Sequence, residues 1–141
     1  MKIQDEGFQG PSIDGQRTGK WTLRYDPEDP NSALKKEAHY ENGRLHGLYA
    51  EYWKSGFRMY CNFVSGVAQG TCKYYYENGQ VRYSGQYLNG EKQGQWHSFT
   101  ATGVHLDRVE FNRGMKVGYA GSAYDRNWKE PVIDFKVTDP I

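Results

Sequence analysis

The chain has 141 residues, a length typical of one domain, and its 18 Lys and Arg nearly balance its 17 Asp and Glu, for a formal net charge of +1. This balance gives no electrostatic basis for binding nucleic acid or an acidic membrane. The sequence has no apolar run of about 18 residues that would predict a membrane span. It also begins without the apolar segment of a secretory signal, so we expect a cytoplasmic protein without stable membrane insertion.

Glycines recur with a period of 23 or 24 residues, and each repeat contains a pair of glycines four residues apart. The pair first occurs as Gly15 and Gly19. The glycines that we interpret as structural turn glycines are Gly43, Gly47, Gly66, Gly70, Gly79, Gly90, Gly94, Gly103, Gly114 and Gly118. Rings keep a constant distance from the second glycine of each pair, for example Trp21, Tyr49 and Trp96, each two residues after it. A period of this length indicates small supersecondary units that stack to bury a common core.

The first repeat is lengthened by a polar insertion at residues 26–36, which includes Glu28 and Asp29. We expect a loop there, with one helical turn from Ser32 to Glu37. The insertion lies outside the repeated pattern, so it is a candidate place for partner specificity.

Two kinds of turn are predicted in each repeat. Asn78-Gly79 separates two strand-like runs, and this dipeptide predicts a tight hairpin in which both residues take a positive φ. Ser55-Gly56 and Thr102-Gly103 occupy equivalent places. The Gly-x-x-x-Gly segment, as in residues 90–94, forms the second connection. Each repeat is therefore two short strands and two turns.

Alternation along the strands assigns side chains to faces of a sheet. Residues 59, 61 and 63 alternate at a period of two and line one face. The rings two and five residues after the second glycine differ in parity, so either a bulge intervenes or rings occupy both faces. We predict an all-β fold, an elongated and twisted antiparallel meander of tandem β-hairpin repeats over about residues 15–118 of a single domain 1–141. Residues 119–141 are predicted to form a C-terminal cap with a strand at 132–137.

The cysteines and histidines, which are the residues most able to act as nucleophiles, bases or metal ligands, do not form a catalytic pattern. Cys61 and Cys72 flank a predicted turn, and we interpret them as two reduced thiols, leaving open whether they pair. The four histidines are His39, His46, His97 and His105, without metal-ligand spacing. His97 is expected to be solvated because it alternates with Trp96. We predict no enzyme activity, no cofactor and no metal site.

The segments Tyr40–Gly43, Tyr76–Gly79 and Tyr87–Trp96 resemble the signatures of MORN repeats, in the variant found in bacterial proteins. Proteins with this variant resemble the YwqK-type antitoxins and bacterial immunity proteins. The resemblance implies a protein-binding module that neutralises a cognate toxin or effector by direct contact, and it brings no catalytic residues. The alternative that it implies is a MORN-type scaffold or membrane-surface module.

The surface that binds a partner is predicted from rings and charges that the repeat does not require. Rigid rings and arginines are typical anchors of protein interfaces. The candidate residues are Trp53, Arg58, Tyr74, Tyr76, Arg82, Tyr83, Glu28, Asp29 and Trp128. Arg58, Arg82 and Arg108 recur at similar spacings and are candidates for an arginine ladder beside the rings, or for a solvated row of charges. An exposed sheet edge would also permit a homodimer.

Overall fold

The computed structural model describes residues 7–121, which form strands and turns without a helix. Two short strands, β1 (Ser12–Ile13) and β2 (Gln16–Arg17), form a separate hairpin. The other strands are β3 (Gly19–Arg24), β4 (Leu34–Glu41), β5 (Arg44–Trp53), β6 (Gly56–Val64), β7 (Val67–Ala68), β8 (Gly70–Tyr75), β9 (Val81–Leu88), β10 (Glu91–Phe99), β11 (His105–Asn112) and β12 (Met115–Gly121).

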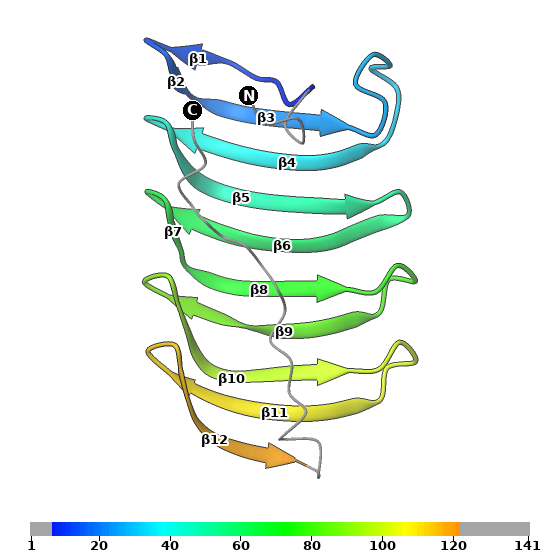
Figure 1. Ribbon diagram of the computed structural model, residues 1–141, viewed down its shortest axis with the longest axis vertical. Helices are drawn as coiled ribbons and strands as arrows, with labels where there is room; N and C mark the ends of the chain where they lie inside the picture. Colours follow the sequence, from blue (N-terminus) through cyan, green and yellow to red (C-terminus); the bar gives the residue numbers. More distant parts are fainter. Residues whose placement is uncertain (1–6, 122–141) are drawn as a thin grey trace.

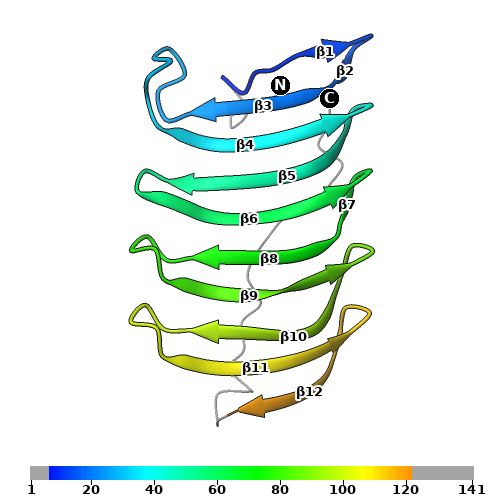
Figure 2. The ribbon, with the colours of Figure 1, turned by 180° about the vertical axis from the view of Figure 1, so that it is seen from behind.

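These strands form one ten-stranded antiparallel sheet in the order β12-β11-β10-β9-β8-β6-β5-β4-β3, with β7 paired to β6. Figures 1 and 2 show the strands stacked in chain order, with every connection at one of the two ends of the strands. The predicted all-β meander is therefore confirmed. The predicted strand at 132–137 and Trp128 lie outside the described residues.

At one end of the strands the connections are two-residue turns, and we call this side of the sheet the tight-turn edge. Both residues of each turn have positive φ, from Asn42 and Gly43 (51° and 78°) to Arg113 and Gly114 (50° and 82°). This pair of angles defines a type I′ turn, whose twist matches that of the flanking strands. The turns stack through backbone bonds, because the Gly90 amide donates to the Ala68 carbonyl at 2.9 Å and the equivalent glycines do the same.

At the other end of the strands the connections are residues 25–33, 53–56, 76–80 and 99–104, and we call this side of the sheet the loop edge. Here the prediction for Asn78 is wrong, since only Gly79 has a positive φ (91°). Asn78 instead accepts a hydrogen bond at its side-chain oxygen from the Gln80 amide at 2.9 Å. Asn has a side chain that closes such turns locally, so the dipeptide predicts a hairpin without deciding its type.

Two other local expectations are corrected. Leu34–Glu41 is a strand paired with β3, so the helical turn from Ser32 to Glu37 does not form and the insertion ends at residue 33. Gly47, Gly70 and Gly94 lie in strands, not in turns, although their φ values are positive. Gly118 lies within β12 and is absent from the positive-φ residues, so its place in the repeat does not require glycine for a turn.

The core lies on one face of the sheet, which we call the core face. Trp96, Phe63 and Phe111 are almost fully buried there. Neighbouring rings meet edge to face, as for Tyr87 and Trp96 with centroids 5.4 Å apart at 85°. Trp96 lies directly against Gly85, where an added Cβ would be only 2.0 Å from an indole carbon. The second ring of each repeat, such as Tyr75, lies on the opposite face, so rings occupy both faces.

A disulfide joins β6 to β8 within the core face. Cys61 and Cys72 continue the register of Met59 opposite Tyr74, and their Cα atoms are 4.4 Å apart. Both residues are fully buried. The expectation of two reduced thiols is therefore wrong. Their spacing of 11 residues placed them at matching positions on two antiparallel strands, which sequence alone did not establish.

Candidate protein-interaction surface

The loop edge is held together by large side chains that reach from one loop to the next. The Tyr25 hydroxyl donates to the Tyr52 carbonyl at 2.7 Å, and the Trp53 indole donates to the Tyr75 carbonyl at 3.2 Å. The Tyr76 hydroxyl donates to the Phe99 carbonyl at 2.8 Å. The three rings therefore occupy equivalent positions in successive repeats and have fixed orientations.

Next to each of these rings the sheet contains a β-bulge. The register shifts leave one extra residue in β4, β6, β9 and β11, and these residues are Lys35, Arg58, Arg82 and Leu106. A bulge redirects the side chain of its extra residue. Because the bulge recurs at one place in each repeat, three cations are presented in a row, one on every second strand of the sheet.

The bulge cations lie over the rings of the loop edge. The Arg58 guanidinium lies 4.8 Å from the centroid of the Trp53 ring, and the Arg82 guanidinium lies 5.3 Å from that of Tyr76. The Lys35 ammonium lies 5.7 Å from the Tyr25 centroid. Distances below about 6 Å are attractive cation–π contacts.

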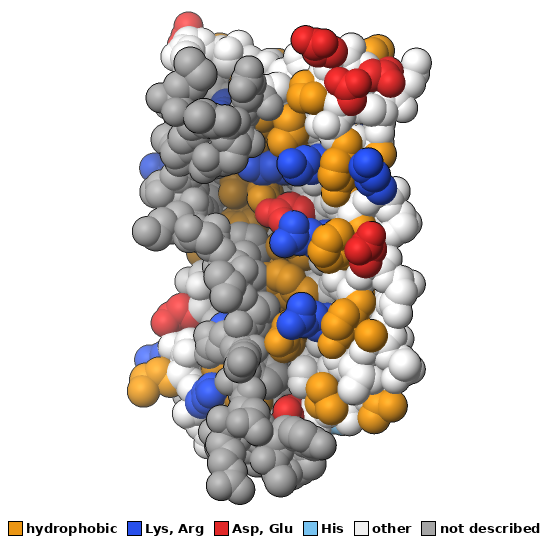
Figure 3. All heavy atoms as spheres, turned by 45° about the vertical axis from the view of Figure 1, so that its right-hand side comes forward, with side chains coloured by type: hydrophobic (Ala, Val, Ile, Leu, Met, Phe, Trp, Pro, Cys, Tyr) orange, Lys and Arg blue, Asp and Glu red, His pale blue; other side chains and the backbone are white. Residues whose placement is uncertain are grey.

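We call this row the cation–ring ladder. Its members are Tyr25, Lys35, Trp53, Lys54, Arg58, Tyr76 and Arg82, where Lys54 is a second cation over Tyr25, at 5.3 Å. Figure 3 shows Lys and Arg side chains beside hydrophobic side chains down this part of the surface.

The cations of the ladder are available for contact. Lys35, Lys54, Arg58 and Arg82 are all exposed. Among the described residues 7–121, no ion pair involves a cation of the ladder. Four positive groups are thus held by rings without a neutralising carboxylate among the described residues.

The structure brings four of the predicted partner-binding residues together, Trp53, Arg58, Tyr76 and Arg82. Glu28 and Asp29 are exposed in the loop at residues 25–33, beyond the Tyr25 end of the ladder. Asp29 also closes that loop, since its carboxylate accepts a hydrogen bond from the Asn31 amide at 2.9 Å.

Tyr74 and Tyr83 do not extend this surface outward. The two rings meet edge to face, with centroids 6.3 Å apart, and both pack against the buried core. The Tyr74 hydroxyl is buried without a hydrogen-bond partner, and this burial raises the pKa of Tyr74 far above its ordinary value. Tyr83 contacts the ladder through Arg82, whose guanidinium lies 5.3 Å from the Tyr83 centroid. We therefore assign Tyr74 to the core.

Arg108 does not belong to the ladder. It lies opposite His97 in the register of β10 and β11, on the face away from the core. The bulge residue equivalent to Arg82 in the next repeat is Leu106, which lies 24 residues after it, whereas Arg108 lies 26 residues after it. Sequence reasoning also missed Tyr25, Lys35 and Lys54. The interval of 23 residues from Lys35 to Arg58, followed by 24 to Arg82, could have identified Lys35.

The opposite face carries a second ring cluster, which consists of Tyr52, Phe57, Tyr60 and Tyr75. Tyr52 stacks on Phe57 with centroids 5.1 Å apart, and Phe57 stacks on Tyr75 at 6.1 Å. Burial, followed by interaction with Tyr60, raises the pKa of Tyr75. These rings stack mainly on one another, although Phe57 remains 40% exposed.

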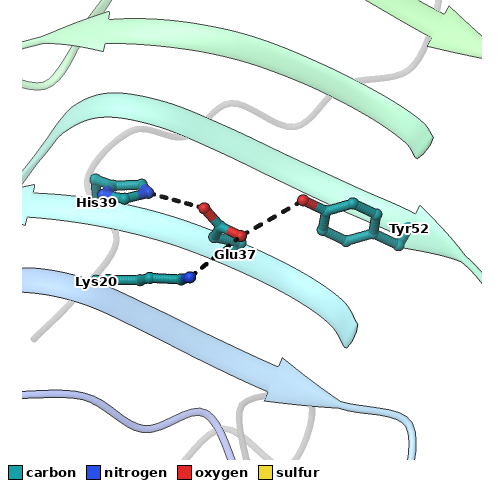
Figure 4. A network of polar contacts seen from close by, with 4 residues as sticks. All are labelled: Lys20, Glu37, His39 and Tyr52. Carbon is teal, nitrogen blue, oxygen red and sulfur yellow. Dashed lines mark hydrogen bonds and ion pairs between the residues drawn. The ribbon is translucent and has the colours of Figure 1, made fainter. Parts of the chain in front are cut away.

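Beside this cluster, Glu37 forms a polar network on the same face (Figure 4). Its carboxylate lies 2.9 Å from the His39 ring nitrogen, 4.0 Å from the Lys20 ammonium, and accepts a hydrogen bond from the Tyr52 hydroxyl at 3.5 Å. Burial and then the Glu37 charge raise the pKa of Tyr52. The Glu37 charge is thus compensated locally, which suits a structural role.

His97 lies on the face opposite Trp96, as alternation predicts, and it is half-exposed rather than fully solvated. Its Nδ1 lies 3.0 Å from the His105 Nε2, and the two rings border Phe99. Burial, followed by the His105 and Arg108 charges, lowers the pKa of His97. Within the described part of the chain no group of three or more His, Cys, Asp or Glu is placed to hold a metal ion.

No protein-family model and no curated protein matches this sequence. Over residues 7–121, no helix has the length and apolar character needed to cross a membrane.

Proposed function

We propose that this chain is a cytoplasmic protein-binding module that acts as an antitoxin or immunity protein, and that the cation–ring ladder is its contact surface. The observation that carries the proposal is the ladder itself, with four exposed cations fixed over rings and not paired with any described carboxylate. Side chains that are already ordered lose little entropy on binding, and aromatic and arginine anchors dominate interface energies.

The antitoxin role rests on the resemblance of segments such as Tyr87–Trp96 to MORN-variant repeats. The ladder, held rigidly at the loop edge, would block a toxin by covering its active site or its assembly surface. Such contacts need shape complementarity around a few anchors and bury on the order of 1,200–2,000 Å².

The test has two stages. The full chain is first used to capture proteins from its native host, in parallel with Arg58→Gln/Arg82→Gln and with the matched control Lys73→Gln/Arg108→Gln, which removes two charges from the opposite face. A captured partner that depends on the ladder arginines is then expressed alone and together with the chain. We expect growth inhibition that co-expression relieves. A partner that is harmless alone, or one retained equally by both double variants, contradicts the proposal.

The alternative function, a membrane-surface scaffold, predicts sedimentation of the chain with anionic vesicles. The exposed carboxylates of Asp26, Glu28 and Asp29 beside the ladder oppose it, because they would face the same surface. We expect no sedimentation at physiological salt.

A further inference from the structure

The spacing of the ladder contains information about the partner that composition does not. Lys35, Arg58 and Arg82 lie on β4, β6 and β9, and one strand separates each of these from the next in the sheet order. Neighbouring strands are about 4.8 Å apart, so successive rungs lie about 9.6 Å apart. The insertion at residues 25–33 does not alter this interval, because it projects from the loop edge (Figure 1).

We infer that the ladder binds an acidic segment of the partner protein in the polyproline II conformation, with a carboxylate at every third residue. This inference rests on the proposed function and specifies its partner. Polyproline II advances about 3.1 Å per residue with three residues per turn, so every third side chain lies on one side at intervals of about 9.3 Å. The length of two polyproline II turns therefore differs from the span of two rung spacings by only about 0.6 Å.

Other regular conformations fit the rungs less well. In a β-strand, residues three apart point to opposite faces, so the second carboxylate would be directed away. In an α-helix, residues seven apart lie about 10.5 Å apart, which gives a mismatch of about 1.8 Å over two intervals. The helix is also about 10–12 Å wide, which is broader than an extended segment.

The chemistry of the rungs favours carboxylates. A guanidinium that lies over a ring keeps its N–H edge free, and that edge forms two parallel hydrogen bonds with one carboxylate. Arg58 and Arg82 are exposed and lack an ion pair within residues 7–121. Lys35 and Lys54 share the Tyr25 ring and provide the third positive rung.

A narrow acidic segment suits this site better than an anionic surface. Glu77 follows Tyr76 in its loop and is exposed, and the acidic loop at residues 26–29 borders the Tyr25 end. In Figure 3 acidic side chains are visible near that end of the molecule. A continuous layer of negative headgroups would meet these carboxylates, whereas a single peptide can follow the cations alone.

The experiment measures fluorescence anisotropy of two labelled peptides with the full chain. One peptide consists of three Glu-Pro-Pro units, and the other has the same composition with its three glutamates adjacent. We expect the spaced peptide to bind about 5-fold more tightly or better. We expect Arg58→Gln/Arg82→Gln to weaken its binding about 10-fold, while Lys73→Gln/Arg108→Gln changes it less than about 2-fold. Circular dichroism and the thermal midpoint verify that both double variants are folded.

Equal affinity for the two peptides would overturn the inference, as would unchanged binding by the ladder variant. Sedimentation with phosphatidylserine-containing vesicles that depends on Arg58 and Arg82 would also overturn it, in favour of a lipid surface. The two proposals can fail separately. A toxin whose capture requires the ladder, combined with peptides bound equally, would retain the proposed function and remove the inferred spacing.

Discussion

The two faces of the sheet use the same repeat in different ways. On the core face, Trp96 is fully buried, its ring lies on Gly85, and its indole donates to the Gln86 carbonyl at 3.1 Å. On the opposite face, three residues along the same strand, Phe99 is only half-buried and borders two histidines. A repeat unit can thus separate stability from surface chemistry by placing its two rings at positions of different parity.

The largest difference between the faces should appear when each ring is removed. Trp96→Ala should lower the free energy of unfolding by about 3–5 kcal/mol, because a fully buried ring leaves a cavity. Phe99→Ala should lower it by about 1 kcal/mol, since that ring is half-exposed. Urea denaturation followed by circular dichroism measures both. Equal losses would mean that the opposite face also contributes a core.

The disulfide should contribute to the core face by restricting the unfolded chain. Cys61 and Cys72 are 11 residues apart, and a loop of about this size is expected to contribute roughly 2–3 kcal/mol. Cys61→Ala/Cys72→Ala should therefore reduce the urea midpoint, and reductant should lower the midpoint of the wild type but not of this variant. A wild-type midpoint that does not respond to a reductant at denaturing urea would show that the bond makes no such contribution.

Gly85 distinguishes the faces within one strand. Gly85→Ala would place a methyl group 2.0 Å from the Trp96 ring, so the sheet must shift, and we expect a loss of about 1–3 kcal/mol. Ser84→Ala, the neighbouring residue on the opposite face, should change stability by less than about 0.5 kcal/mol. Thermal denaturation compares the two. A tolerated Gly85→Ala would show that the core face can open locally.

The fold could be predicted from the sequence because its signals are local. Glycine spacing and ring alternation fix the turns, the strands and their order in an antiparallel meander. Turn type was less accessible, since Asn78 adopts a different geometry from Asn89 although both precede glycine. The choice depends on loop length and on the bonds across the loop, which the dipeptide does not specify.

The candidate site was predicted only in part for a different reason. Trp53, Arg58, Tyr76 and Arg82 were found because they are rings and arginines near the repeated turns. Their arrangement depends on the bulges, because one extra residue in a strand changes the direction in which the cation's side chain points. Approximate spacing therefore grouped Arg108 with Arg82, although a difference of two positions puts Arg108 beside His97.

The smallest expected effect is a pH dependence confined to the opposite face. The folded protein lowers the pKa of His97 below its ordinary value of 6.5, chiefly by burial, so the unfolded chain binds protons more readily there. Stability from this group is thus fully present above about pH 6.5 and is lost as the pH falls through the folded pKa. His97→Gln should flatten the decline of the thermal midpoint between about pH 7 and pH 5, and His105→Gln should reduce it by removing the neighbouring charge. Lys73→Gln, on the same face and outside the histidine pair, should retain the wild-type slope. If His97→Gln retains that slope too, the acid sensitivity comes from carboxylates elsewhere, and the two faces do not differ in this respect.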